Sequence, residues 1–486
     1  MKENLEGKLT EGSVAARLVA FSLPFLMANF LQTLYGMADL FIAGQFNGAD
    51  VITAVSIGSQ IMHMITVIIA GLAMGTTVLT ARAVGAGKER DAGLCAGNSL
   101  LAFLIFSVFA TAILFVFCPQ IVALMHTPPE AVGETLSYLG ICFLGIPFIS
   151  LYNSVSAVFR GAGDSKRPLY FVAASCLVNI ILDVFFMGPL ALGSRGAALA
   201  TVLSQAFSAF LAAFVLFARG KRGASGEAYG SGGASDEARA SSGSRVKSVA
   251  CVRILRGDFR MDAKVLKALL QIGLPVSAQD GFIQVSFLVI TIIANSRGLS
   301  VAAAVGIVEK IICFLFLVPS SMLSAISALA AQNMGASLHA RARHTLYAGM
   351  AIASAFGALF ALAFQFASVP FVSLFTHDAE VVQLGGQYLR SYVFDCFFAA
   401  FHFAFSGFFC AYGYSLLSFV HNTVSILLVR IPGAYFAAKY FPGTLYPMGW
   451  APAIGSLLSS LICLGFYLLL KRNGKFGGGL ERHGGK

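Results

Sequence analysis

The chain of 486 residues is 57% hydrophobic and only 11% charged, with a mean hydropathy of +0.80. Soluble globular chains carry about 25% charged residues, so this composition excludes a water-soluble fold of this size and predicts a protein that crosses the bilayer several times. The nine cysteines show no CxxC pair or metal-ligand spacing, and they predict neither a disulfide framework nor a metal site.

Twelve apolar runs follow one another along the chain, each long enough to span a bilayer as a helix. Because the runs are continuous rather than alternating, they predict α-helices and disfavour a β-barrel. The expected fold class is therefore an all-α membrane protein with twelve transmembrane helices. The predicted spans lie at 17–43, 52–84, 93–118, 131–159, 169–190, 196–218, 264–296, 301–333, 342–368, 379–411, 416–440 and 449–470.

The first six spans and the last six share residues at a nearly constant offset. Pro24 and Pro275 lie in the first span of each group, 251 residues apart, and Gly85 and Gly335 follow the second span of each group, 250 residues apart. With six spans per half, equivalent helices keep the same orientation in the membrane. We therefore predict two pseudo-symmetric six-helix bundles, a layout that secondary transporters use for alternating access.

Residues 219–263 separate the two groups of spans and differ from both in composition. Their centre is rich in Gly and Ser, which cannot bury enough apolar surface to become ordered, and basic residues flank it. The predicted organisation is an N-terminal bundle at 1–218, a flexible basic cytoplasmic linker at 219–263, and a C-terminal bundle with a short cytoplasmic tail at 264–486. The basic flanks fit contact with an anionic leaflet and plain solvation equally well.

Basic residues gather on one side of the membrane if the helices alternate in direction. The positive-inside rule then places both termini and the linker in the cytoplasm of a multi-pass plasma-membrane protein. The net charge of +11 follows from this topology, so nucleic acid is not an expected partner. Apart from the linker, the residues that set the orientation are Lys88, Arg90, Arg160, Lys166, Arg167, Arg341, Arg343, Lys471, Arg472 and Lys475.

Two carboxyl groups lie inside predicted spans, each with polar neighbours on its own helical face. Gln32, Tyr35 and Asp39 share one face at offsets of three and seven, and Asn179 and Asp183 share another at i, i+4. An apolar cavity penalises the ionised form of a carboxyl group, so such a group can load and release a proton. A hydrogen-bonded structural acid is the alternative, and we favour proton coupling.

Three further acids lie within spans, and for them a structural role is at least as well supported as a functional one. Glu309 is followed by Lys310, and Asp395 lies little more than one turn after Arg390, so each has a cation nearby in sequence. Asp280 lies near the start of its span, where it could face a cavity.

Motifs of soluble and membrane enzymes are absent from the sequence. The chain contains no GxxxxGK[ST] phosphate-binding loop, no HExxH zinc motif and no GxSxG nucleophile motif. We predict that the protein is not an enzyme and uses no cofactor and no metal. Transport would then take its energy from an ion gradient or from the gradient of the substrate.

A set of sequence motifs, in this order and with twelve spans in two similar halves, resembles the multidrug and toxic compound extrusion (MATE) family. The resemblance covers nearly the whole chain. It implies a V-shaped pair of six-helix bundles that rock between outward and inward states and export lipophilic, often cationic compounds in exchange for H+ or Na+. The motifs are LYGMADLFIAGQ at 34–45, GLAMGTTVLTARAVGAG at 71–87, RGAGDSKRP at 160–168 and NIILDVFF at 179–186.

The pattern of Asp39, Asn179 and Asp183 is similar to that of the proton-coupled, DinF-like branch of the family. The branch described as Na+-coupled carries a glutamate in its seventh span, near Ile283 here, and Asp280 lies one turn away. In the DinF-like branch these positions line a cavity of the N-terminal bundle. The resemblance adds as neighbours of that cavity Gln32, Asn153, Thr201 and Tyr138.

We therefore predict a monomeric antiporter in which substrate and proton favour different states of one cavity, with Asp39 and Asp183 as the proton-coupling residues. Its partners would be small lipophilic or cationic molecules and membrane lipids, and its coupling ion H+, with Na+ left open. Two alternatives remain at this point: a lipid-linked precursor flippase of the same superfamily, for which the spans lack a cluster of cations, and a passive channel.

Overall fold

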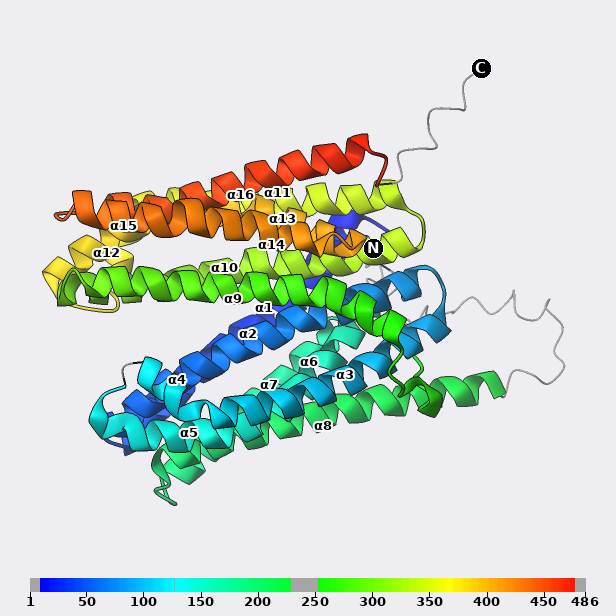
Figure 1. The fold of residues 1–486 in the computed structure, drawn as a ribbon, viewed down its shortest axis with the longest axis horizontal. Helices are drawn as coiled ribbons and strands as arrows, with labels where there is room; N and C mark the ends of the chain where they lie inside the picture. The colour runs from blue at the N-terminus through cyan, green and yellow to red at the C-terminus, as the bar shows by residue number, and fades with distance from the viewer. Residues whose placement is uncertain (1–8, 126, 229–251, 477–486) are drawn as a thin grey trace, which may run out of the picture. The chain divides into compact units, whose positions relative to one another are not determined.

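The structure, a computed structural model, describes residues 9–125, 127–228 and 252–476 of the chain. These residues are almost entirely helical, and the helices run alongside one another within two compact units (Figure 1). We name these units the N-terminal bundle, residues 23–270, and the C-terminal bundle, residues 271–476. The first part of the first helix, Gly12–Ser22, groups with the C-terminal bundle.

The N-terminal bundle is formed by seven helices and most of an eighth, and its connections are short. Its helices are α1 (Val14–Phe46), α2 (Ala49–Gly85), α3 (Glu89–Val116), α4 (Cys118–Leu124), α5 (Val132–Leu144), α6 (Ile146–Gly161), α7 (Lys166–Met187) and α8 (Gly193–Ala228).

The C-terminal bundle repeats this plan. Its helices are α9 (Ala263–Asn295), α10 (Leu299–Gly335), α11 (His339–Val372), α12 (Ala379–Tyr392), α13 (Phe394–Tyr412), α14 (Ser415–Ser425), α15 (Ile431–Tyr440) and α16 (Tyr446–Arg472).

Eleven helical segments of the described chain are long and apolar enough to cross a membrane. A twelfth span follows when Pro129–Leu144 and Ile146–Gly161 are taken together, although they are bent by 44° at their junction. The prediction of an all-α membrane protein with twelve spans in two similar halves is thus confirmed.

Local sequence explains where the spans bend. The fourth span breaks at Gly145, because Pro147 in the first turn of α6 has no N–H to continue the helical hydrogen bonds of α5. The span predicted at 416–440 widens into a π-helical turn at Ile426–Arg430, which ends two residues before Pro432. A proline in a helix collides with the preceding turn, and a π-turn relieves that collision by adding a residue.

Close packing in the N-terminal bundle depends on a glycine in α2. The Tyr138 ring of α5 lies against Gly58, where a Cβ atom would come within 2.2 Å of the ring. The Tyr138 hydroxyl hydrogen-bonds with the Ser59 hydroxyl at 3.1 Å. This ring is part of the apolar core that also includes Val55, Leu139 and Phe143.

Residues 252–262 pack against the N-terminal bundle, although the sequence placed them in a flexible linker. The Gly/Ser-rich middle of that linker, residues 229–251, lies outside the described residues. The Asp258 side chain is buried, forms an ion pair with Arg90 of α3 at 2.6 Å, and accepts a hydrogen bond from the Leu255 backbone N–H at 2.8 Å. The Asn98 amide of α3 donates to the Arg260 carbonyl at 2.7 Å. We call residues 252–262 the docked segment.

Two glycines of α3 admit the backbone of the docked segment. A Cβ atom on Gly93 would lie 2.2 Å from the carbonyl oxygen of Arg253, and one on Gly97 would lie 2.6 Å from the carbonyl oxygen of Asp258. Both partners are backbone atoms, so no side-chain rotation relieves the collision. The docked segment therefore depends on the absence of side chains at these two positions.

A single methyl group on α3 should release the docked segment. In Gly97→Ala the new Cβ displaces the Asp258 backbone, and we expect trypsin cleavage at Arg253 and Arg260 to accelerate about tenfold or more, since cleavage follows the population of the open form. Mass spectrometry identifies the cleavage sites. Gly140→Ala is the matched control, because its Cβ meets only Phe115 at an ordinary 3.9 Å. Equal cleavage rates in the two variants would contradict this account.

Candidate functional site

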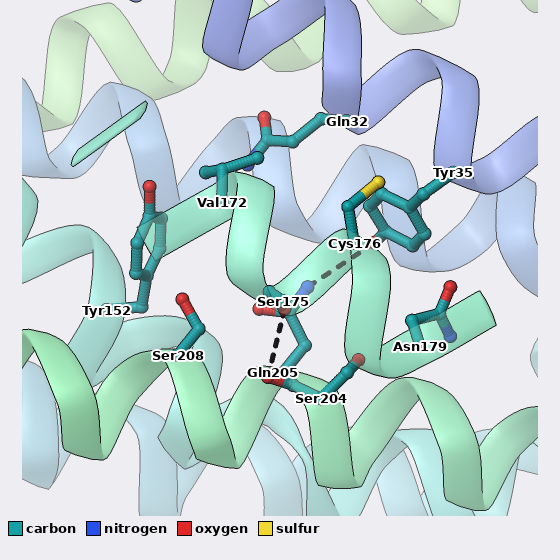
Figure 2. A pocket seen from close by; sticks show the side chains of 10 residues that line it. All are labelled: Gln32, Tyr35, Tyr152, Val172, Ser175, Cys176, Asn179, Ser204, Gln205 and Ser208. Atoms are coloured by element: carbon teal, nitrogen blue, oxygen red, sulfur yellow. Dashed lines mark hydrogen bonds between the residues drawn. The ribbon is translucent and has the colours of Figure 1, made fainter. Parts of the chain in front are cut away.

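A polar pocket lies inside the N-terminal bundle, between α1, α6, α7 and α8 (Figure 2). None of its lining side chains is acidic or basic. Aromatic rings and neutral hydrogen-bonding groups suit apolar and cationic molecules, whereas phosphate recognition calls for arginine or lysine. The lining residues are Gln32, Tyr35, Tyr152, Val172, Ser175, Cys176, Asn179, Ser204, Gln205 and Ser208.

Hydrogen bonds across the pocket tie α8 to α1 and to α7. The Gln205 amide of α8 donates to the Tyr35 hydroxyl of α1 at 3.3 Å, and the Ser175 hydroxyl of α7 donates to the Ser204 carbonyl of α8 at 2.9 Å (Figure 2). These contacts fix the orientation of polar groups that face the pocket. They also connect three helices whose positions would have to change together.

The two acids predicted for proton coupling lie together, one helical turn beyond the pocket. Asp39 follows Tyr35 on α1, and Asp183 follows Asn179 on α7. Both side chains are buried, with 2% and 0% of their surface exposed. The Asp39 carboxyl group lies within interaction range of Asp183, Asn179 and Thr201. The structure therefore brings residues from α1, α7 and α8 into one group, which we call the acidic cluster.

Polar atoms of the acidic cluster lack hydrogen bonds of standard geometry. This holds for Oδ1 of Asp39, both carboxylate oxygens of Asp183, both amide atoms of Asn179 and the Thr201 hydroxyl. Within the described part of the chain neither acid forms an ion pair. An unsatisfied buried polar group costs about 1–3 kcal/mol. A proton between the carboxyl groups, or a cation bound by them, would lower that cost.

Two other residues assigned to the cavity by resemblance are not among the side chains that line this pocket. The Asn153 side chain is on α6 beside Tyr152, but its amide donates to the Ile149 carbonyl of the same helix at 2.9 Å. Tyr138 is not among the residues that line this pocket, because its ring fills the core space over Gly58. Tyr138 is thereby placed in the packing of the bundle.

The pocket also contains residues that the sequence reasoning did not single out. Ser175 could have been found, because Ser175, Asn179 and Asp183 recur every four residues and form one polar stripe on α7. Tyr152 and Cys176 carried no such signal. Neither residue is part of a repeating polar pattern in the sequence, and the packing of α6 and α7 turns both towards the pocket.

Asp395 of the C-terminal bundle forms a buried ion pair. Its Oδ2 lies 2.7 Å from Nη2 of Arg430, and its Oδ1 accepts a hydrogen bond from the Ser456 hydroxyl. The Arg430 guanidinium also lies over the Phe287 ring, 5.3 Å from its centroid. The sequence suggested Arg390 as the partner, but the Arg390 Nε donates to Ser368 instead.

The remaining two acids of the C-terminal bundle have different surroundings. Glu309 accepts a hydrogen bond from the Thr291 hydroxyl at 3.1 Å and is partly buried. Asp280 is also partly buried, on α9. Among the described residues, no group of three or more His, Cys, Asp or Glu side chains is placed to hold a metal ion.

Repeated six-span halves, an internal polar pocket and buried acids define the class of this protein as a multi-pass membrane transporter. A family model described as MatE matches residues 24–185 and again residues 275–436, one match in each bundle. Together the matches cover more than half of the chain. The chain therefore belongs to the MatE family, as its motifs predicted, and it is a transporter rather than an enzyme.

Curated relatives and solved structures agree with this assignment. The chain is 25% identical to the probable multidrug resistance protein YoeA of Bacillus subtilis (strain 168), over 79% of this chain and 78% of YoeA. It is 26% identical to YpnP of the same organism, also described as a probable multidrug resistance protein, over 87% and 88% of the two chains. The crystal structure of MATE in complex with MaL6 shares the fold, with a TM-score of 0.83, 23% identity, and coverage of 98% of this chain and 100% of that one.

Removing one partner of the buried ion pair should destabilise the C-terminal bundle. Asp395→Ala leaves the Arg430 guanidinium buried without its counter-charge, which costs about 3–5 kcal/mol. We expect a large loss of thermal stability in detergent, and we expect the double variant Asp395→Asn/Arg430→Gln to recover part of it.

The exposed pair of Lys88 and Asp91, 3.9 Å apart, provides the matched control. Asp91→Ala should change the melting temperature little, because exposed ion pairs contribute about 0–1 kcal/mol. If Asp395→Ala were as stable as the Asp91→Ala variant, or if the double variant were no more stable than Asp395→Ala, the ion pair would not have the role assigned to it.

Proposed function

We propose that this protein exports lipophilic, often cationic small molecules across the plasma membrane in exchange for H+, with Na+ as the alternative coupling ion. The description of YoeA and YpnP as probable multidrug resistance proteins supports the substrate class. The observation that carries the proposal is an uncharged pocket one helical turn from two buried acids that have no cationic partner among the described residues.

Proton coupling follows from the cost of charge in this environment. Two carboxyl groups held together in a low-dielectric interior share one proton at lower cost than they carry two negative charges. Protonation adds a hydrogen-bond donor to the acidic cluster, and deprotonation leaves only acceptors. The hydrogen-bond partners of Asn179 and Thr201 must therefore differ between the two protonation states.

The acidic cluster and the pocket are connected by shared residues and by shared helices. Asn179 contacts Asp39 and lines the pocket, and Tyr35 lies one turn from Asp39 while its hydroxyl binds Gln205. A change of protonation thus alters the groups that face a substrate. A cation bound near the deprotonated cluster is favoured by its negative charge and loses that attraction when protons enter. Substrate and proton then stabilise different states, as antiport requires.

The orientation completes the proposal. The basic residues of one set of connections favour cytoplasmic termini, and with that orientation the substrate would enter from inside and the proton from outside. The acidic cluster in the N-terminal bundle supports membership of the DinF-like, proton-coupled branch. Since Arg430 already neutralises Asp395, that acid is a poor candidate for binding a coupling ion.

The flippase alternative is disfavoured by the pocket itself. A lipid-linked precursor carries a pyrophosphate, and its recognition needs arginine or lysine side chains in the cavity. All ten lining residues are uncharged side chains. The pocket instead offers the rings of Tyr35 and Tyr152 to an aromatic or cationic molecule.

Neutralising the acidic cluster should abolish coupling. In proteoliposomes with an imposed pH gradient, we expect Asp39→Asn and Asp183→Asn each to lower the export of a fluorescent lipophilic cation by about tenfold or more, because the amide can no longer exchange a proton. Both variants should keep the thermal stability of the parent within a few degrees, since asparagine matches the shape of aspartate.

Asp50→Asn, at an exposed position in the first turn of α2, is the matched control and should export at the parent rate. A Na+ gradient imposed without a pH gradient separates the two coupling ions. Export at the parent rate by both cluster variants under a pH gradient would overturn the proton-coupling assignment.

The charge of the pocket can be tested separately from its size. Cys176→Lys and Cys176→Met add side chains of similar length to the same wall, and only lysine adds a charge. We expect the lysine variant to lose export of a cationic dye at least about tenfold more than export of a neutral one, because the added charge repels only the cation. The methionine variant should affect both dyes alike. An equal loss of both dyes in the lysine variant would show that this pocket does not bind the cation.

A further inference from the structure

The outer face of the docked segment continues a lipid-facing stripe of α8. Phe210, Phe214 and Phe217 recur at i, i+4 and i+7 on α8, and all three side chains are exposed, Phe214 to 71%. In a membrane-spanning helix, an exposed face of this composition contacts lipid. The Phe259 ring of the docked segment lies 6.2 Å from the Phe217 ring and is itself 43% exposed. The stripe therefore ends on Phe259.

Basic residues follow and precede Phe259 in the chain. Residues 252–267 contain five basic and two acidic residues. Both acids already have partners within the protein. Asp258 is buried and pairs with Arg90. Asp262 accepts hydrogen bonds from the backbone N–H groups of residues 264 and 265 at the start of α9. Arg260, Lys264 and Lys267 are exposed. An aromatic ring at the edge of the lipid-facing surface, with cations beside it, is the arrangement of a membrane-interface anchor.

The docking of the backbone distinguishes this surface from a solvated basic loop. The Asp258 ion pair, the Asn98 hydrogen bond and the two α3 glycines hold the segment in place, which fixes Phe259 and Arg260 against the N-terminal bundle. Lys264 and Lys267 follow in the first turns of α9. Fixed cations lose less conformational entropy on binding than those of a flexible chain. Anionic lipid headgroups carry the complementary charge at the depth where an interfacial phenylalanine lies.

We propose that Phe259, Arg260, Lys264 and Lys267 form a binding surface for anionic phospholipids. The acyl chains lie along Phe259 and the α8 stripe, and the headgroup phosphates bind the three cations. The assignment of this surface to the cytoplasmic leaflet rests on the orientation proposed above, and the rest of the proposal does not. The surface does not depend on the transported substrate or on the coupling ion.

A tryptophan at position 259 can report the lipid beside it. Trp450 is the only tryptophan in the chain, so Phe259→Trp in a Trp450→Phe background gives a single fluorophore. The full-length protein is placed in equimolar phosphatidylcholine and phosphatidylglycerol, with bromine on the acyl chains of one lipid or of the other. Random mixing predicts equal quenching by the two brominated lipids. We expect brominated phosphatidylglycerol to quench about threefold more strongly.

Removing the cations should abolish that preference. In Arg260→Gln/Lys264→Gln/Lys267→Gln the two brominated lipids should quench equally. Lys471→Gln/Arg472→Gln/Lys475→Gln removes the same charge from the exposed end of α16 and the turn that follows it, and should leave the preference unchanged.

The proposal is overturned by equal quenching in the parent, by a preference that survives in the first triple variant, or by a fluorophore that neither lipid quenches. Asp39→Asn/Asp183→Asn, which should not export, is expected to keep the lipid preference. Failure of the lipid surface and failure of the export mechanism therefore give different results.

Discussion

An ionised carboxyl group inside an apolar helix bundle must find a cation, hydrogen-bond donors or a proton, because its burial otherwise costs several kcal/mol. The two bundles of this transporter meet that requirement differently. In the C-terminal bundle, Arg430 and Ser456 satisfy Asp395. In the N-terminal bundle, the polar groups that interact with Asp39 are a second acid, an amide and a hydroxyl. Only the second arrangement leaves the proton as the means of removing charge.

This difference is not inherited from the internal repeat. At the offset of 251 residues that relates Pro24 to Pro275 and the two matched regions to each other, Asp39 corresponds to Ile290, Asp183 to Ala434, and Asp395 to Leu144. The duplicated backbone is thus preserved while the buried polar groups are not. The repeat supplies two scaffolds with equivalent helix orientations, and each bundle carries its own electrostatic arrangement. Proton coupling confined to one bundle is consistent with this division.

The sequence could predict those features that arise from local periodicity. Continuous apolar runs located the spans, and the spacing of Asn179 and Asp183 located one wall of the acidic cluster, because residues four apart share a helical face. Partners far apart in sequence could not be found this way. Arg390 was the nearer cation to Asp395 along the chain, but Arg430, 35 residues away, is its partner, since helix packing decides which side chains meet. Docking of residues 252–262 likewise depends on two glycines of α3, about 160 residues earlier, that accept the backbone.

The docked segment also bears on where the chain can bend between the two bundles. Residues 252–270 belong to the N-terminal unit, so the boundary between units falls within α9, after Leu270, and not between α8 and α9. The other boundary falls within α1, after Ser22. Pro24 lies inside α1, two residues after Ser22, and Pro275 lies inside α9, five residues after Leu270. A proline removes a backbone hydrogen bond from the helix and weakens its rigid continuity. The antiport that we propose would need two bodies joined by deformable connections, and the equivalent prolines of the repeat lie where the chain passes from one unit to the other.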